Sequence, residues 1–339
     1  MRQYIWLNKW CILLVLIFVN GLFSCQQSQI QKVGFLFPNM LHDRYLKEKI
    51  YFTERIKQLG GEALIESAKN DDKLQVQQAD ELINNGVKVL VVNPVNLYSS
   101  AEIVRNAHNH GIIVIAYDRI IFNSDLDYYL SFDNEKVGML MAEYVIKKVP
   151  EGKYLLFGGD KDDFNAVLVK NGQLKLLGPL TTSGKINIDY NIFVEDWSEE
   201  NARHELKRYI DLSGSQPDVI LSSYDGMSTG IINTLKEYGL EGKVLVTGQD
   251  AELNACRNIV KGYQIMTVYK PLKKIAYAAA DLSLKLIKSQ KLTEATSKVF
   301  NGNKEVPSIL LEPISVDKDN LKSTVIADGL LSETEVYQP

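Results

Sequence analysis

Short runs of aliphatic and β-branched residues alternate along the chain with longer stretches whose apolar residues recur every three or four positions. This alternation predicts strands joined by helices, the pattern of parallel α/β sheets. Most runs are continuously apolar, which is typical of strands that helices cover on both faces. The predicted strands are 32–37, 62–67, 88–94, 112–118, 154–159, 187–193, 218–223, 243–248 and 264–269.

The order of strand and helix runs through the chain twice, from residue 32 to 130 and again from 153 to 262. It predicts an α/β fold of two doubly wound parallel-sheet lobes, joined by a multi-strand hinge and separated by a cleft. Residues 130–134 and 268–271 are the expected crossings. We expect an N-terminal lobe of residues 32–132 and 271–305, and a C-terminal lobe of residues 133–270 and 306–339 that includes a strand at 307–316.

The first 25 residues have the features of an export signal. A positively charged start precedes the apolar run 10–19, which is too short and too asymmetric for a membrane span. The four residues LFSC (22–25) resemble the bacterial lipobox, whose cysteine becomes the lipidated first residue after cleavage. We expect a lipoprotein signal peptide at 1–24, lipidation of Cys25 and a polar tether at 25–31; an ordinary signal with a chance cysteine is the alternative.

Composition narrows the possible functions. The chain has 339 residues and a net charge of -4, without a basic block, so we expect no nucleic-acid partner. Of its three cysteines, Cys11 lies in the signal and Cys25 would carry lipid, which leaves Cys256 alone. We therefore expect no internal disulfide, and no cysteine or histidine spacing predicts a metal site or cofactor.

Polar side chains follow nearly every predicted strand. Asp118 and Arg119, for example, come directly after an apolar run. Ligands bind beyond the carboxyl ends of the strands in open parallel sheets, so these side chains are expected to surround the cleft. The candidate binding residues are Arg44, Tyr45, Asp118, Arg119, Asp163, Asn165, Trp197, Tyr224, Asp225, Asp250 and Lys270.

These residue types suit a monosaccharide. Carboxylates, amides and arginine offer planar arrays of donors and acceptors for adjacent hydroxyls, and Trp197 and Tyr45 offer flat apolar faces for the C–H side of a sugar. A phosphate ligand would call for a glycine-rich turn at a helix start, and the stretch 157–166 has neither GxGxxG nor a Walker lysine.

Other interpretations remain open. Asp43, Asp225 and Asp250 could cap helices, and Trp197 could pack as a hydrophobic staple. An exported hydrolase could use two of the carboxylates as acid and base, although no nucleophile or metal motif accompanies them, so we expect no catalytic residue. A transcriptional regulator would need a DNA-binding headpiece where this chain has a signal.

The same strand ends resemble the periplasmic sugar-binding proteins of ABC importers, the type I periplasmic binding proteins, and most closely the members that bind D-xylose. The resemblance covers essentially the whole chain after the signal. The stretches that carry it are AYDR (116–119), YLSFDNEKVG (129–138), LFGGDKDDFNA (156–166), GQLKLL (172–177), DWSEENA (196–202), GKVLVTGQDAEL (242–253), MTVYKP (266–271) and residues 306–329.

The resemblance implies that two lobes close on one sugar. It implies contacts from Arg44, Asp118 or Arg119, Asn165, Trp197, Asp250 and Lys270. Four positions depart from the D-xylose-binding members: Tyr45 stands in place of Trp, Phe164 and Tyr224 in place of Asn, and Lys170 in place of Arg. Tyr224 matters most, because the asparagine it replaces touches the sugar, so D-xylose is one ligand among related aldoses.

The sequence therefore predicts a monomeric, non-enzymatic binding protein that is held in the periplasm by a lipid anchor. Its partners would be a monosaccharide and either an ABC permease or the sensor domain of a membrane kinase. The residues do not separate transport from sensing.

Overall fold

The computed structural model describes residues 30–41 and 43–338. The expected signal peptide and Cys25 lie outside the described residues. A seven-stranded sheet, ordered β11-β12-β5-β4-β3-β1-β2, is parallel except for the antiparallel pair β11 and β12. Its strands are β1 (Gln31–Phe37), β2 (Gly61–Ser67), β3 (Val89–Val92), β4 (Ile113–Tyr117), β5 (Tyr128–Phe132), β11 (Ser297–Phe300) and β12 (Glu305–Leu311).

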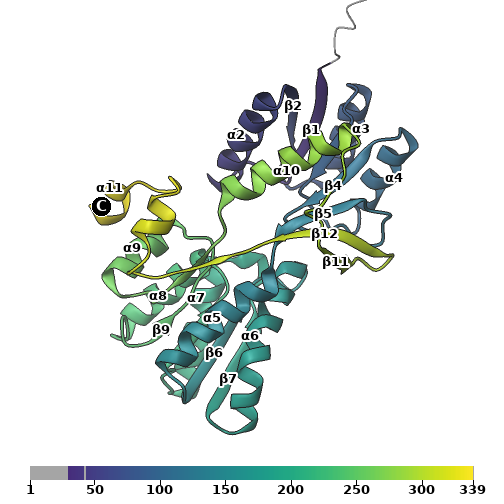
Figure 1. Cartoon of the computed structure of the whole chain (residues 1–339). Helices are drawn as coiled ribbons and strands as arrows, with labels where there is room; N and C mark the ends of the chain where they lie inside the picture. Colours follow the sequence, from purple (N-terminus) through teal and green to yellow (C-terminus); the bar gives the residue numbers. More distant parts are fainter. Residues whose placement is uncertain (1–29, 42, 339) are drawn as a thin grey trace, which may run out of the picture. The chain divides into compact units, whose positions relative to one another are not determined.

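Helices cover both faces of this sheet (Figure 1). Helices α2 (Asp43–Gln58) and α10 (Leu272–Ile287) pack on one face, and α3 (Asp72–Asn84) and α4 (Ala101–Asn109) on the other. Successive residues of β3 alternate between the two apolar layers: Val89 and Val91 face α2 and α10, and Leu90 and Val92 face α3 and α4. Because both layers are apolar, the strand is continuously apolar in sequence, as predicted.

A second, four-stranded parallel sheet is built in the same way. Its order is β7-β6-β8-β9, with β6 (Gly152–Gly158), β7 (Ile186–Phe193), β8 (Val219–Ser222) and β9 (Leu245–Val246). Helices α5 (Asn134–Lys148) and α6 (Phe164–Thr182) share one apolar cluster with β6, and α7 (Glu199–Ser213) and α8 (Asp225–Glu237) share another on the opposite face. Both sheets are thus doubly wound, as the repeated order predicted.

Three segments connect the two sheets. Strand β5 leads into α5, β10 (Thr267–Tyr269) leads into α10, and β12 leads into β13 (Ile314–Val316), which pairs antiparallel with β10. Beyond β13, a short π-helix (Lys322–Ile326) and α11 (Glu333–Tyr337) pack near α9 (Leu253–Lys261) around Cys256 and Val325. No helix in the described part of the chain is both long and apolar enough to cross a bilayer.

One expected boundary is wrong. Residues from 306 onward were assigned to the C-terminal lobe, with one strand at 307–316. Instead, β12 pairs in parallel with β5 inside the seven-stranded sheet, and only β13 leaves it. Pro313 lies between the two strands and lacks the N–H that a ladder needs, so the apolar run is divided there.

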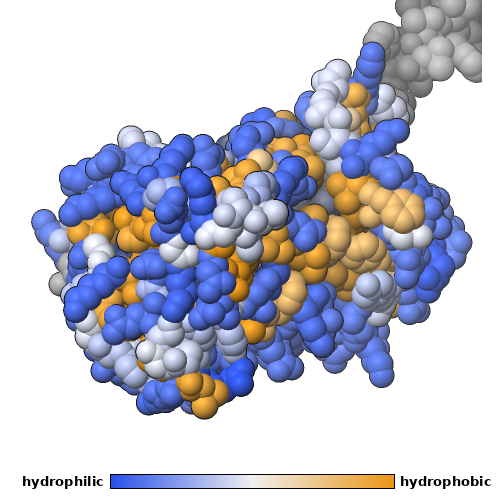
Figure 2. Space-filling model, turned by 90° about the horizontal axis from the view of Figure 1, so that it is seen from below, coloured by the Kyte–Doolittle hydropathy of each residue, from blue (hydrophilic) through white to orange (hydrophobic). Residues whose placement is uncertain are grey.

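Hydrophilic side chains cover most of the face drawn in Figure 2, with smaller apolar areas between them. Leu41 and Leu212, at 82% and 79%, are the most exposed large hydrophobic side chains among the described residues. Leu41 precedes α2, which packs on the first sheet, and Leu212 lies in α7, which packs on the second.

Candidate ligand-binding site

A cavity of about 1440 Å³ lies beyond the carboxyl ends of strands from both sheets. Its wall includes residues that follow β4, β6, β7, β8 and β10, as the rule for open parallel sheets predicts. Ten of the eleven candidate residues line it: Arg44, Tyr45, Asp118, Arg119, Asp163, Asn165, Trp197, Tyr224, Asp250 and Lys270. Asp225 does not.

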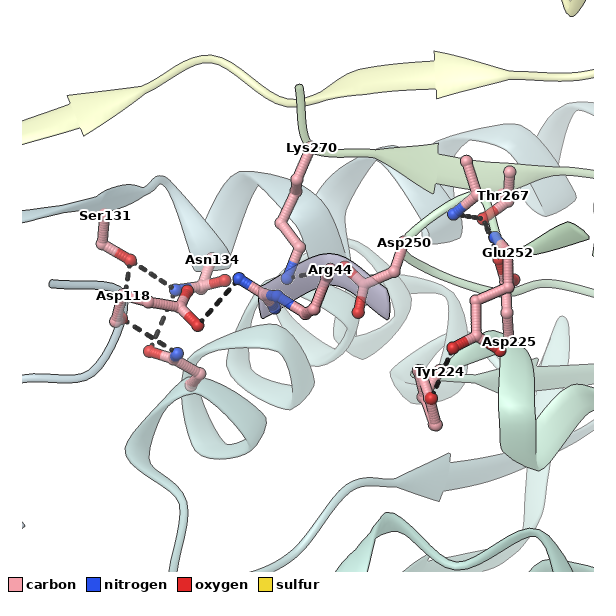
Figure 3. Close-up of polar contacts among 12 residues, drawn as sticks. Arg44, Asp118, Ser131, Asn134, Tyr224, Asp225, Asp250, Glu252, Thr267 and Lys270 are labelled. Atoms are coloured by element: carbon pink, nitrogen blue, oxygen red, sulfur yellow. Dashed lines mark hydrogen bonds and ion pairs between the residues drawn. The ribbon is translucent and has the colours of Figure 1, made fainter. Parts of the chain in front are cut away.

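Arg44 links the first turn of α2 to the end of β4. Its Nη2 donates to Asp118 Oδ2 at 3.1 Å and to Glu48 Oε1 at 2.9 Å (Figure 3 shows the first contact). Burial opposes the charge on Arg44, but Glu48 and Asp118 outweigh it and hold the pKa of the guanidinium well above its ordinary value. Burial likewise opposes ionisation of Asp118, and Arg44 and Lys270 outweigh it, so the pKa of Asp118 is lowered.

The backbone at Asp118 is strained and firmly held. Its φ is 64°, in the left-handed region that non-glycine residues rarely occupy. The Asp118 carbonyl accepts hydrogen bonds from Tyr129 OH at 3.1 Å, Ser131 Oγ at 2.8 Å and Asn165 Nδ2 at 3.1 Å. Asn165 in turn accepts from Asn134 Nδ2 at 3.0 Å. These contacts fix the turn that aims the Asp118 carboxylate at Arg44.

Two further ion pairs line the cavity. Arg119 Nη2 lies 3.1 Å from Asp163 Oδ2, and Lys270 Nζ lies 2.9 Å from Asp250 Oδ1. Burial disfavours the Arg119 charge, but Asp163 outweighs it and raises the pKa of the guanidinium. Asp163 also caps α6, because its side chain accepts from the backbone N–H of Asn165. Asp163 therefore serves both as the N-cap of α6 and as part of the cavity wall.

Aromatic side chains form two walls of the cavity. The Trp197 ring meets the Tyr224 ring edge to face, with centroids 6.1 Å apart. Trp197 lies over Gly159, where an added Cβ would come within 2.3 Å of the indole, so only glycine fits there. On the other wall, Phe122 stacks on Tyr98 at 5.5 Å and meets Phe164 edge to face at 5.2 Å. Such rings suit the apolar face of a sugar.

Asp225 is the candidate that the structure places elsewhere. Its side chain is fully buried, where it accepts from Gln264 Nε2 at 2.8 Å, Thr267 Oγ1 at 3.0 Å and the Glu252 backbone N–H at 2.9 Å. Burial, followed by the nearby Glu252 carboxylate, raises the pKa of Asp225 well above its ordinary value. Asp225 thus ties the start of α8 to the loop that carries Asp250 and does not reach the cavity.

Glu252 also lines the cavity, although it is not among the candidate residues identified from the sequence. It accepts a hydrogen bond from Tyr224 OH at 2.6 Å, beside Asp225 in Figure 3. Burial raises the pKa of Glu252, and the bond from Tyr224 partly offsets that effect. The Tyr224 phenol therefore donates its hydroxyl to a protein carboxylate, while its ring packs edge to face with Trp197.

Glu48 and Lys170 do not line the cavity, but each contacts a residue that does, Arg44 and Phe193 respectively. Glu48 lies among the buried positions of α2, with Tyr45, Phe52 and Ile56. A carboxylate inside that apolar stripe, four residues after Arg44, is a sequence signal that could have found it. Lys170 is 6% exposed, donates to the Ile192 carbonyl at 2.6 Å and lies 3.6 Å from the centre of the Phe193 ring. Burial lowers the pKa of Lys170 to about 8.

The charged groups of the cavity are arranged to bind hydroxyls. Asp118, Asp163 and Asp250 are each paired with a cation. Within the described residues, no group of three or more His, Cys, Asp or Glu side chains is arranged to hold a metal ion. The paired groups leave N–H donors and carboxylate lone pairs available to a polyhydroxy ligand.

Comparisons with known proteins agree with this geometry. A model of the periplasmic binding protein domain matches residues 33–291. A D-xylose-binding periplasmic protein of Haemophilus influenzae is 40% identical over 93% of this chain and 94% of its own length. The corresponding Escherichia coli protein is 39% identical over 90% of this chain and 92% of its own length.

A solved structure is also similar throughout. The solute-binding protein of an ABC transporter from Clostridium phytofermentans, with bound β-D-glucose, superposes with a TM-score of 0.82 at 28% identity. The similarity covers 90% of this chain and 100% of that one.

Proposed function

Because the chain belongs to the periplasmic binding protein family, we propose that it is a periplasmic monosaccharide-binding protein that presents its ligand to an ABC importer. The relatives are solute-binding proteins and not enzymes, so the chain is a binding protein and the hydrolase alternative is excluded.

The observation that carries the proposal is the combination of ion pairs and aromatic walls around one cavity. Arg44, Arg119 and Lys270 present donors, their carboxylate partners present acceptors, and Trp197 presents a flat apolar face. A pyranose needs all three, because its ring carries hydroxyls around the edge and C–H groups on its faces.

The charge of the cavity wall favours a neutral sugar. Nine carboxylates line the cavity against four cations, Arg44, Arg119, Lys161 and Lys270. Several of the unmatched carboxylates follow β6 and β7. An excess of negative charge around a cleft repels anionic ligands, so sugar phosphates and uronic acids are poor candidates.

Among neutral sugars, D-xylose or a related aldose is our proposal. The support is the resemblance to D-xylose-binding proteins over nearly the full chain. Tyr224 favours a sugar preference that differs from that of the D-xylose-binding relatives. Its hydroxyl is engaged by Glu252 and so is not available to the ligand, and its ring fills space beside Trp197.

We propose that the two sheets with their helices act as lobes. Allowing for β12, the first lobe would comprise residues 31–132 and 271–311, and the second 133–270 and 312–338. A sugar that touches both lobes only when they are closed shifts the population toward that state. An ABC permease would then recognise the closed form; a membrane sensor kinase is the alternative partner. Lipid on Cys25 would keep the protein at the membrane.

The test is a thermal-shift panel on residues 26–339, which contain the whole compact unit Gln31–Pro339. We expect saturable stabilisation by one or a few neutral aldoses, among them D-xylose, and none by D-glucuronate or sugar phosphates. Arg119→Ala and Asp250→Ala should abolish it, while Arg203→Ala, which removes a surface ion pair with Glu237, should not.

A flat response to every neutral sugar would refute the proposal. The bound sugar should also be recovered chemically unchanged after prolonged incubation, as expected for a binding protein.

A further inference from the structure

Glu48 is a buried carboxylate that contacts Arg44, a residue of the cavity wall. Its side chain is 0% exposed, and its Oε1 accepts from Arg44 Nη2 at 2.9 Å. Its other oxygen, Oε2, is buried as well, and the buried Tyr117 hydroxyl interacts with the Glu48 carboxylate. The carboxylate is thus removed from water, which disfavours its charged form.

The groups that face Glu48 come from three segments. Arg44 lies one turn earlier on α2, Tyr117 and Asp118 lie at the end of β4, and Lys270 follows β10. Burial raises the pKa of Glu48 to about 7, with Arg44 acting in the opposite direction. Asp118 adds to the rise and Lys270 opposes it.

We propose that Glu48 is a positioning residue for Arg44, and that binding of the sugar is coupled to the ionisation of Glu48. This inference rests on the proposed function, because it assigns a role to Glu48 in the binding of that same ligand. Glu48 does not line the cavity and acts only through Arg44.

The direction of the coupling follows from the exposure of the two partners. The Arg44 side chain is 21% exposed, whereas Glu48 is already at 0%. A bound sugar replaces the water around Arg44, which strengthens its attraction to the Glu48 carboxylate in a medium of lower dielectric constant. The ligand adds no comparable desolvation cost to Glu48. Binding therefore favours the ionised carboxylate and releases a proton.

Affinity should consequently rise with pH. Below about pH 7 Glu48 is protonated and offers the Arg44 guanidinium only an uncharged oxygen, whereas above about pH 7 the two side chains form an ion pair. Since a hydrogen bond between two charged groups is stronger than one with a single charged partner, we expect affinity to be about fivefold higher at pH 8 than at pH 6.

Trp197 provides the readout. It is the only tryptophan after residue 25 and lines the cavity, so its fluorescence reports binding. Residues 26–339 are titrated from pH 6 to 8 with D-xylose, or with the panel sugar that stabilises the protein most. Calorimetry at pH 7 in two buffers of different ionisation enthalpy then measures the protons released.

The expected result is an affinity that rises with pH and a buffer-dependent enthalpy, both lost in Glu48→Gln while sugar binding is retained. Glu48→Asp, which keeps a carboxylate, should restore part of the pH dependence. Glu54→Gln, an exposed position on the same helix, should behave as the wild type.

A Glu48→Gln protein with the same pH profile and the same proton release as the wild type overturns the inference, even if sugar binding is normal. If Glu48→Gln fails to fold, a pH-independent affinity in the wild type would overturn it as well. If no panel sugar binds the wild type, the proposed function fails first and the inference falls with it.

Discussion

Buried charges in the cavity are arranged in mutually compensating pairs. Each of Arg44, Arg119 and Lys270 has a carboxylate within 3.1 Å. A buried charge without a partner is strongly destabilising, so these pairs must exist before any ligand arrives. The backbone reflects the same demand, because Asp118 and Asp250 hold φ values of 64° and 95° to aim their carboxylates.

Tyr224 offers a test of specificity at a single residue. Tyr224→Asn removes the ring beside Trp197 and the hydrogen bond to Glu252, which enlarges that end of the cavity. We expect hexoses to gain about tenfold or more relative to D-xylose, because one extra carbon group discriminates by that order. Competition titrations of Trp197 fluorescence would measure the ratio.

The matched control is Tyr238→Asn. The Tyr238 hydroxyl also bonds a carboxylate, Asp211, but it lies at the end of α8 and outside the cavity. An unchanged sugar ratio in Tyr224→Asn, or an equal change in the control, would contradict the role of Tyr224.

At the scale of elements, α5 and α6 make a close contact through two glycines. An added Cβ on Gly138 would lie 1.8 Å from the Val169 carbonyl oxygen, and one on Gly172 would lie 1.9 Å from the Glu135 carbonyl oxygen. The two helices thus pack backbone against backbone below the site. Because α6 begins with Phe164 and Asn165, this contact also sets the depth at which Asn165 meets Asp118.

We therefore expect Gly138→Ala to destabilise the protein by roughly 2 kcal/mol or more, since the helices would have to separate. Gly178→Ala lies in the same helix α6 with nothing within 4 Å of the new Cβ, and should stabilise by up to about 1 kcal/mol. Chemical denaturation of both variants gives the two free energies of unfolding. Similar values for the two would show that the close contact is unimportant.

At the scale of the whole molecule, we expect ligand binding to change the shape of the protein. If the sugar joins two lobes, the radius of gyration of residues 26–339 should decrease when the sugar is added. Small-angle X-ray scattering measures this directly. Arg119→Ala with the same sugar should show no decrease, and a wild-type radius that does not respond would argue for binding without closure.

The proposed attachment to the membrane would depend on Cys25, which lies outside the described part of the chain. Cys25→Ser should release the protein from membranes into the soluble fraction, because no other lipidation site is expected. Cys11→Ser, within the signal, is the control and should leave attachment unchanged. Cell fractionation with immunodetection separates the outcomes, and a membrane-bound Cys25→Ser protein would refute the lipid anchor.

The sequence by itself determined the elements and the edge of the sheets where the site forms. Strands such as β3 are apolar on both faces, and this is visible in a single short run. Polar residues directly after such strands must lie at the carboxyl edge, whatever the remaining packing. That local rule placed Asp118, Asn165 and Asp250 at one cavity.

The tertiary structure decided which of those groups reach the cavity. Asp225, like Asp118, follows a strand, yet it turns toward Gln264 and Thr267, while Glu252 lines the cavity. The tertiary structure also pairs β12 with β5, which no local sequence pattern indicated. These outcomes depend on contacts between segments far apart in sequence, such as Arg44 with Asp118, and a linear pattern carries no information about which distant partner a side chain will meet.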